Sequence, residues 1–397
     1  MSSTGYYQYN MRTVVHSAPG SIIRVPALFK GMQARRVVLF SEEGSRQTGL
    51  VDQLISLFDA GGSVPKLAGV FADIPPVANC ETVNTALRFT REVAADAILA
   101  VGGSGVPEVS KGVKYALHHQ FTDIREGLQT RMNMDSWPHA TDMKIPHMAV
   151  ATTAGSGAEV SSAARFFNED LEGHCSLINP FLGPDMVVLD ANLTLGSPSH
   201  LTATTGMAAL AHALEAVASP LANHLSDAHA FRAAQLIVEN LPLAVSNGKD
   251  VQARTNLLQA GIMAQNAFCA SRNATPIHEC ANAFSAFCAV SQGEANAVLL
   301  PVCIEAFSDF YLPSVGRLAV ALNLQAKGKE DNVLLADVIA CLRSLQKVIG
   351  IDRTPAHWSV TPDNTEKIIT AVMSSPTRFI YQIHTDKIAE IIRHVVD

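Results

Sequence analysis

The sequence predicts an α/β nucleotide-binding domain followed by an all-helical domain. Up to about Leu195, short β-rich runs alternate with helical patterns, and this alternation is typical of a parallel, doubly wound sheet. After SPSHLTATTG, residues 197–206, the β-rich runs stop and long amphipathic segments follow. A chain of 397 residues with 48% hydrophobic residues can bury two cores of moderate size. We therefore expect domains at residues 1–195 and 196–397.

The elements of the first half follow from apolar runs bounded by glycine or polar residues. Strands are expected at RRVVLF (35–40), KLAGVFADI (66–74), DAILAVGG (96–103), HMAVATTAG (147–155) and MVVLD (186–190). Helices are expected at TGLVDQLISLFDAGG (48–62), ETVNTALRFTREVA (81–94) and EVSKGVKYALHH (108–119). The least regular stretch, residues 129–144, is expected to be a loop. In the second half, long helices are expected at 226–245, 253–270 and 332–350.

Charge and cysteine content exclude several classes of protein. The formal net charge is −7 and there is no basic run, so we expect no nucleic-acid partner. The N-terminus lacks the apolar core of a leader peptide, and no apolar stretch is long enough for a membrane span. The seven cysteines show no CxxC spacing, which predicts neither a disulfide framework nor a zinc knuckle. A cytoplasmic protein without a membrane contact is expected.

A glycine-rich loop follows the third expected strand, in DAILAVGGSGVPEVSKG. Gly102, Gly103, Ser104 and Gly105 lie between that strand and the next helix. Glycine lets the backbone approach a phosphate closely, and the free N–H groups of a helix N-terminus bind its charge. These residues form a candidate pyrophosphate cradle. The alternative is that these residues form only a tight turn. The position of this loop also differs from that of the usual dinucleotide fingerprint, which follows the first strand.

A second loop of small residues, in HMAVATTAGSGAEVSSAA, also follows a strand. Thr152, Thr153 and Ser156 offer hydroxyl groups, and a polar helix is expected to start after them. Because open α/β sheets bind ligands at the carboxyl ends of their strands, both loops could face one crevice. The alternative is that both loops are only helix caps.

One histidine stands out in the helical half, in GMAALAHALEA (206–216). A metal held by His212 needs a second ligand one helical turn away, because residues four apart share a helix face. The residue one turn earlier is Ala208, which cannot coordinate a metal. The histidine is therefore either structural or part of a rebuilt site.

The motifs and their order resemble the iron-containing (group III) alcohol dehydrogenase family. The resemblance covers nearly the whole chain and rests on LVDQLISLFDAGG, VGGSGVPEVSK, TTAGSGAEV, VVLDANLTLGSP, LTATTGMAALAHALEA, LIVENLPLAV and ANAVLLPV. It implies a Rossmann-like α/β domain, an all-α domain that carries a divalent metal, and a cleft between them, as in the dehydroquinate synthase-like fold. It also implies an NAD(P)-dependent alcohol dehydrogenase that forms a homodimer.

On the cofactor side, the resemblance assigns residues one by one. The family's cofactor positions correspond here to Glu42, Gly102, Gly103, Ser104, Gly105, Glu108, Lys111, Thr152, Thr153, Ser156 and His174. Glu42 stands where the family usually has an aspartate beside the adenosine ribose, and His174 where it often has a lysine. A carboxylate at Glu42 accepts hydrogen bonds from a free 2′-OH and repels a 2′-phosphate, so NAD(H) is favoured over NADP(H).

On the metal side, the resemblance is incomplete. The four ligand positions of the family correspond here to Ala208, His212, His278 and Gln292, and a further family histidine is replaced by Asn282. Zinc and iron(II) sites commonly use three protein ligands, so two imidazoles and an amide oxygen are expected to hold a divalent metal weakly or not at all. Glu215, Glu279 and Cys280 are alternative ligands, although the last two follow His278 too closely to share its helix face. A packed relic, in which the imidazoles bond each other, is a further alternative.

We therefore expect an NAD(H)-dependent oxidoreductase that reduces an aldehyde or ketone in an altered or metal-free site. Without a metal, the substrate oxygen needs hydrogen-bond donors or a protonated imidazole, and His212, His278, Asn282 and Gln292 are the candidates. Maleylacetate reductases are the precedent within the superfamily. Arg272 is a candidate anchor for an anionic substrate, or else a surface arginine. The alternatives are an alcohol dehydrogenase with unrecognised metal ligands and a nucleotide-binding pseudoenzyme.

Overall fold

The fold is known from a computed structural model that describes residues 7–60, 62, 65–153, 155–271, 275–288, 290–351, 357–375 and 381–396. Contacts within the chain divide it into two units. The α/β unit comprises residues 10–153 and 157–195, and the helical unit comprises the described residues of 1–9, 154–156 and 196–397. The predicted fold class, a parallel sheet with helices followed by an all-helical region, is confirmed.

A parallel sheet lies at the centre of the α/β unit, with the strand order β1-β9-β6-β4-β2-β3. Its strands are β1 (Val14–Ser17), β2 (Arg36–Ser41), β3 (Lys66–Phe71), β4 (Ala97–Gly102), β6 (His147–Ala151) and β9 (Met186–Leu189). Strands β4 and β6 are buried along their whole length, because helices cover both faces of a parallel sheet. The five predicted strands are present. β1 is an additional edge strand, and its Val14 and Val15 are exposed.

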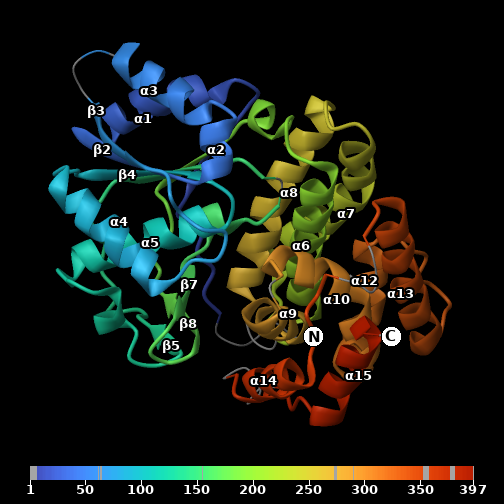
Figure 1. The fold of residues 1–397 in the computed structure, drawn as a ribbon. Coiled ribbons are helices and arrows are strands. Elements are labelled where there is room, and N and C mark those ends of the chain that lie inside the picture. Colours follow the sequence, from blue (N-terminus) through green and yellow to red (C-terminus); the bar gives the residue numbers. More distant parts are fainter. Residues whose placement is uncertain are drawn as a thin grey trace. The chain divides into compact units, whose positions relative to one another are not determined.

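Helices cover both faces of this sheet (Figure 1). They are α1 (Val25–Gly31), α2 (Glu43–Gln47), α3 (Leu50–Ala60), α4 (Cys80–Glu92) and α5 (Gly105–His118). Helices α1 and α3 bury Phe29, Leu54 and Phe58 in one core with the sheet, and α4 and α5 lie on the opposite face (Figure 1). The helices cover the two faces of the sheet, so the loops that follow the carboxyl ends of the strands remain uncovered by them.

A second, smaller sheet of the α/β unit consists of β5 (Met132–Met134), β8 (Gly173–Ile178) and β7 (Ala163–Asn168). β7 and β8 pair antiparallel, and β5 pairs parallel to β8. Burial alternates along β7 and β8, as expected where only one face of a sheet is covered. The cover is α5, from which Lys111 Nζ donates to the Ala163 carbonyl at 2.8 Å. Helix α5 therefore packs between the two sheets (Figure 1).

The segment after β6 differs from the prediction. The helix expected near Glu159 is only a 3₁₀ turn, Ala158–Val160, and the chain then enters β7. The next residue, Ser161, is extended, and its Oγ accepts the Ala163 N–H at 3.1 Å. A serine that bonds nearby backbone in this way competes with helix formation. The loop expected at 129–144 also differs, because it contains β5.

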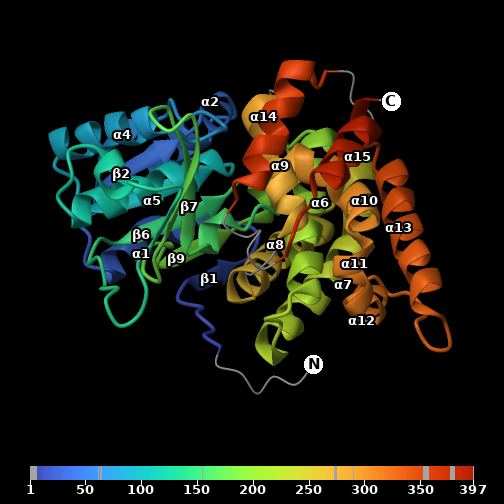
Figure 2. The ribbon, with the colours of Figure 1, turned by 90° about the horizontal axis from the view of Figure 1, so that it is seen from below.

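The helical unit is built around α6 (Figure 2). Its helices are α6 (Ser199–Ala218), α7 (His224–Ser246), α8 (Val251–Ala270), α9 (Pro276–Phe287), α10 (Gln292–Ala306), α11 (Ser308–Tyr311), α12 (Val315–Ala321), α13 (Asp331–Val348), α14 (Pro362–Met373) and α15 (Thr385–Val396). Helix α6 packs against α7, α8 and α10. Its many alanines favour the helix and permit this close packing. At Gly206, a Cβ would lie 2.4 Å from Leu241 Cδ1 of α7, so any larger residue there would displace the Leu241 side chain.

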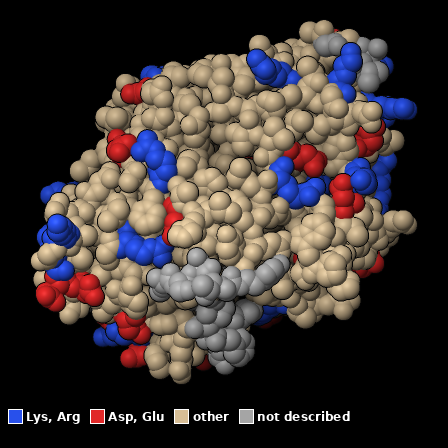
Figure 3. Space-filling model, turned by 180° about the vertical axis from the view of Figure 1, so that it is seen from behind, with Lys and Arg blue, Asp and Glu red and all other residues tan. Residues whose placement is uncertain are grey.

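Two observations bear on the predicted absence of membrane and nucleic-acid partners. No single helix of the described chain is long and apolar enough to cross a membrane, although the bent pair 292–306 and 308–321 passes the length and composition test together. On the face shown in Figure 3, side chains of both signs are interspersed. That face therefore lacks the single-sign basic patch that binds a nucleic-acid backbone.

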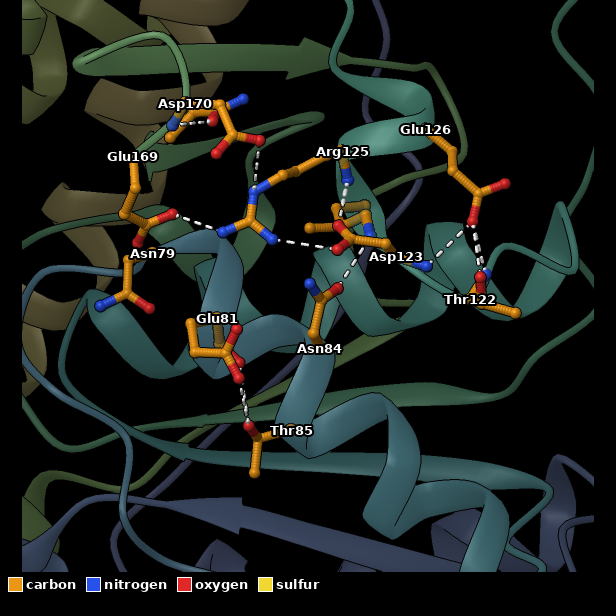
Figure 4. A network of polar contacts seen from close by, with 12 residues as sticks. Asn79, Glu81, Asn84, Thr85, Thr122, Asp123, Arg125, Glu126, Glu169 and Asp170 are labelled. Carbon is orange, nitrogen blue, oxygen red and sulfur yellow. Dashed lines mark hydrogen bonds and ion pairs between the residues drawn. The ribbon is translucent and has the colours of Figure 1, made fainter.

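An ionic network joins the 3₁₀ turn that follows α5 to the small sheet (Figure 4). At its centre is Arg125, in the 3₁₀ turn Ile124–Gly127. Its guanidinium contacts Asp123 at 2.9 Å, Glu169 at 2.8 Å and Asp170 at 3.3 Å, and the last two lie in the turn between β7 and β8. The Arg125 side chain is only 23% exposed, so its contacts are partly shielded from water.

We expect Arg125→Met to lower the free energy of unfolding of the α/β unit by about 1–3 kcal/mol, the usual loss for charged hydrogen bonds. Arg88→Met is the control, because Arg88 and its partner Glu81 are 57% and 65% exposed and such a pair contributes less than about 1 kcal/mol. Urea denaturation of both variants measures the difference. Equal midpoints for the two variants would show that the Arg125 network does not stabilise this unit.

Candidate active site

The order of the strands places a switch point between β2 and β4. From β2 the chain passes to β3 on one side, then returns to β4, β6 and β9 on the other side. Open α/β sheets bind ligands outside the carboxyl ends of the strands at such a reversal. Glu42 directly follows β2, and the loop from Gly102 to Gly105 connects β4 to α5. Two of the predicted cofactor segments therefore meet at the expected place.

The glycine-rich loop is packed from two sides. The Gly103 N–H donates to Glu42 Oε1 at 2.8 Å. On the other side, a Cβ on Gly105 would lie 2.3 Å from the Pro75 carbonyl oxygen, so only glycine fits. Helix α5 starts at Gly105 and receives no hydrogen bond from the Ser104 side chain. The Val106 N–H donates to the Gly103 carbonyl, so the N–H groups of Ser104 and Gly105 are the ones left for an anion.

The second predicted loop lies next to the first. A Cβ on Gly103 would lie 3.8 Å from Thr153 Cγ2, and Thr152 immediately follows β6, the neighbour of β4. Two residues further on, the chain belongs to the helical unit. There, a Cβ on Gly155 would lie 2.5 Å from the Thr205 carbonyl oxygen of α6. Ser156 belongs to the helical unit as well, whereas Thr152 and Thr153 belong to the α/β unit.

Three other predicted cofactor residues face the small sheet. Lys111 is fully buried and lies 3.5 Å from Glu108, whose Oε2 accepts the Arg165 N–H of β7. These two residues fix α5 against β7. His174 lies on β8, where burial lowers its pKa to about 3, assisted by Arg165 and Arg131. At neutral pH it is uncharged and offers no positive charge to a nucleotide.

In the helical unit, two histidines and a phenylalanine form a ring cluster. His212 of α6 stacks on His278 of α9 with 4.5 Å between the ring centres and 16° between the planes. Phe268 of α8 lies 4.8 Å from His212 and 4.6 Å from His278. The structure thus brings together the two histidines that the sequence places 66 residues apart.

Glu215 is the residue whose role the sequence does not reveal. It lies one turn after His212 on α6, is buried, and contacts His278 Nδ1 through Oε2. Its Oε1 accepts the Ile277 N–H at 2.8 Å. Burial raises the pKa of this carboxyl well above its usual range, although backbone N–H groups of Ile277 and His278 lower it. The one available signal is an acid three residues after a histidine in an otherwise apolar helix.

The other predicted residues of this site form an amide pair. Gln292, the first residue of α10, donates from Nε2 to Asn282 Oδ1 of α9 at 2.8 Å. Asn282 is one turn after His278 on α9, and Ala208 is one turn before His212 on α6. Arg272 lies outside the described residues.

The residues at the family's metal position do not fit a divalent metal as they are arranged. A metal held by an imidazole lies in the ring plane at about 2 Å from the nitrogen. The planes of His212 and His278 are inclined by only 16°, so they do not meet within that distance. Ala208 offers no ligand atom, and Gln292, whose Nε2 donates to Asn282 Oδ1, has only a neutral amide oxygen to offer. In the described part of the chain, no three His, Cys, Asp or Glu side chains are grouped to hold a metal.

Comparison with known proteins identifies the family. Residues 13–191 match the family model for iron-containing alcohol dehydrogenase, and residues 202–396 match the C-terminal model of the Fe-containing alcohol dehydrogenase family. The chain is 32% identical over 295 residues to a probable alcohol dehydrogenase, EutG, of Salmonella typhimurium, covering 72% of this chain and 70% of that protein. It is 31% identical over 300 residues to 1,3-propanediol dehydrogenase of Klebsiella pneumoniae, covering 74% of each.

A solved structure shows the same fold. The crystal structure of a 1,3-propanediol oxidoreductase matches with a TM-score of 0.88 at 26% identity, covering 98% of this chain and 100% of that one. Both halves of the chain thus match one family in sequence, and the whole chain matches it in structure. The chain belongs to the iron-containing alcohol dehydrogenase family and is an oxidoreductase of that family.

Proposed function

We propose that this protein is an NAD(H)-dependent reductase of aldehydes or ketones in which side chains, rather than a metal ion, polarise the substrate oxygen. The observation that carries the proposal is the parallel stack of His212 on His278, with Glu215 on Nδ1 of His278. This stack occupies the helices on which the family holds its metal. Ala208 and Gln292 replace the two missing ligands.

The residues at the switch point fit a nicotinamide dinucleotide. The N–H groups of Ser104 and Gly105 at the start of α5 suit the pyrophosphate, and the glycines let it approach the backbone closely. When bound, the dinucleotide supplies the hydride for the reduction. The carboxylate of Glu42 accepts a hydrogen bond from a ribose 2′-OH and repels a 2′-phosphate, which favours NAD(H) over NADP(H).

The helical cluster supplies hydrogen-bond donors for the substrate oxygen. An imidazole and a primary amide each carry N–H donors, and Gln292 already donates one of its own to Asn282 Oδ1. That bond fixes the Asn282 amide, whose Nδ2 is then a positioned donor. Donors that are held in place before the reaction stabilise the negative charge that develops on a carbonyl oxygen. His212, His278, Asn282 and Gln292 are therefore the proposed catalytic residues.

Two other functions have less support. A conventional metal-dependent alcohol dehydrogenase needs further ligands, but Glu215 uses both oxygens, on the Ile277 N–H and on His278. A nucleotide-binding pseudoenzyme would keep the glycine loop and lose turnover. We also expect a homodimer, because the family resemblance implies one.

The test is metal analysis and turnover on the same protein, purified without an affinity metal. We expect well under one iron or zinc ion per chain, and aldehyde-dependent NADH oxidation that a chelator does not change. NADH is expected to be used in preference to NADPH. One tightly held metal per chain, with activity lost on chelation, would establish the conventional enzyme instead. Cofactor binding without turnover of any aldehyde or ketone would establish the pseudoenzyme.

A further inference from the structure

We propose that Glu42 has a second task, which is to hold the glycine-rich loop in place before any nucleotide binds. One carboxylate oxygen, Oε1, positions the loop through Gly103, and the other, Oε2, is left for the ribose. Glu42 is thus both a positioning residue and a specificity residue. This inference rests on the proposed use of a nicotinamide nucleotide.

The backbone shows why the loop needs a side-chain partner. The pairing of β2 with β4 ends at Ser41 and Val101, and Ser41 Oγ donates to the Val101 carbonyl at 2.8 Å. Beyond this point, β2 has no backbone carbonyl for the Gly103 N–H. Glu42 Oε1 takes that place at 2.8 Å. The side chain therefore continues the connection between the two strands after their ladder has ended.

The carboxylate also packs across the glycines. A Cβ on Gly103 would lie 3.5 Å from both carboxylate oxygens, and one on Gly102 would lie 3.2 Å from Oε1. Gly103 in turn uses its carbonyl to accept the Val106 N–H at 3.1 Å. The Gly103 N–H donates to Glu42 and its carbonyl accepts from Val106, so the Gly103 backbone has a fixed orientation. The start of α5 is fixed with it.

Two consequences follow for nucleotide binding. The Gly103 N–H is already used, so the N–H groups of Ser104 and Gly105 are the ones left for a phosphate. Glu42 Oε2 has no hydrogen-bond partner within the described part of the chain, so it is available to a ribose hydroxyl. Loop position and ribose recognition therefore depend on different atoms of one side chain, and they can be separated by substitution.

Three substitutions make that separation. Glu42→Gln keeps an oxygen for the Gly103 N–H but removes the charge. Glu42→Asp keeps the charge but shortens the side chain by one methylene, which withdraws it from Gly103. Glu42→Ala removes both. Glu43→Ala is the matched control, because the exposed Glu43 on α2 contacts only Arg46 and Gln47 among the described residues.

The first measurement is amide hydrogen exchange at Gly103 in nucleotide-free protein, which needs no activity. We expect protection in wild type, Glu42→Gln and Glu43→Ala, and at least about tenfold faster exchange in Glu42→Asp and Glu42→Ala, as expected for the loss of one charged hydrogen bond. Equal exchange in all of these proteins would overturn the positioning role. The circular dichroism spectrum and melting temperature confirm that each variant is folded.

The second measurement is the affinity for NADH and NADPH. Glu42→Ala is expected to lower the affinity for NADH by about 10- to 100-fold, the loss that follows from removing one charged hydrogen bond. Glu42→Gln should retain most NADH affinity while narrowing the preference over NADPH by about tenfold or more. Equal NADH affinity in Glu42→Gln and Glu42→Ala would overturn the inference. If wild type binds neither nucleotide, the proposed function fails. Amide exchange at Gly103 still tests whether Glu42 holds the glycine-rich loop in place.

Discussion

We expect His278→Ala to lower the single-turnover reduction of a carbonyl substrate by about 10²- to 10³-fold, the usual loss when one donor to a developing oxyanion is removed. His278 contacts His212, Phe268 and Glu215, all within the helical unit. The predicted nucleotide residue Glu42 and the glycine loop belong to the α/β unit. The affinity for NADH is therefore expected to stay unchanged.

A loss of stability has to be distinguished from this loss of rate. Without His278, Glu215 loses the partner of its Oε2, which costs about 1–3 kcal/mol of unfolding free energy, so kinetics are measured well below the melting temperature of the variant. Phe268→Leu is the control, because it removes the ring contacts of Phe268 with both histidines but no hydrogen-bond donor. It is expected to lower the melting temperature while sparing turnover. Full turnover in folded His278→Ala protein would exclude His278 from catalysis, and equal rate losses in both variants would assign the effect to packing.

Ala208→Asp combined with Gln292→His is expected to create a divalent-metal site. The pair restores one aspartate and one histidine to the family's ligand positions, and Glu215 already orients His278 through Nδ1, as outer carboxylates do for metal-binding histidines. The histidine stack has to open to bring both rings to one ion. Zn²⁺ at a hundredfold excess over its dissociation constant should then raise the unfolding free energy by about 2.7 kcal/mol.

Thermal melting with and without Zn²⁺ measures this gain, and metal analysis after dialysis gives the stoichiometry. The single variants Ala208→Asp and Gln292→His are the controls, and each is expected to bind more weakly because it has three of the four ligands of the double variant. Adding His278→Ala to the double variant removes one of its four ligands and should reduce the rise in melting temperature to that of the single variants. An equal rise in the wild-type melting temperature would show that the existing residues already hold a metal.

The main sheet could be predicted from the sequence because its strands are buried on both faces and therefore read as continuous apolar runs. The edge strand β1 lacks that signal, since Val14 and Val15 are exposed. In the hairpin of β7 and β8, buried residues alternate with half-buried ones, so neither strand forms a continuous apolar run. It depends on α5 for its cover, and the sequence does not show which helix will lie over which strand.

The same distinction applies to the site. The glycine loop lies at a strand end, where local sequence already predicts it, and the family resemblance adds Glu42 at the end of another strand. The strand order then brings them together. The contact between Glu215 and His278 joins residues 63 positions apart, and no local pattern reports it. The stacking of the two histidines is equally non-local. Sequence alone could name these histidines but not the orientation that argues against a shared metal.

The close packing of Gly155 against two helices limits how this chain can be cut into fragments or joined to a relative. Gly155 lies against α6 and α8, and a Cβ on Gly261 of α8 would lie 2.8 Å from the Gly155 Cα. Thr153 and Gly157, on either side of this loop, belong to the α/β unit. A fragment that starts at Gly196 would lack this loop, as well as the Tyr9 hydroxyl that bonds His229. A chimaera that exchanges the helical half with a relative must therefore match the loop to small residues on the new helices. The helical unit is therefore assembled from three separate stretches of the chain, and a cut at Gly196 preserves only one of them.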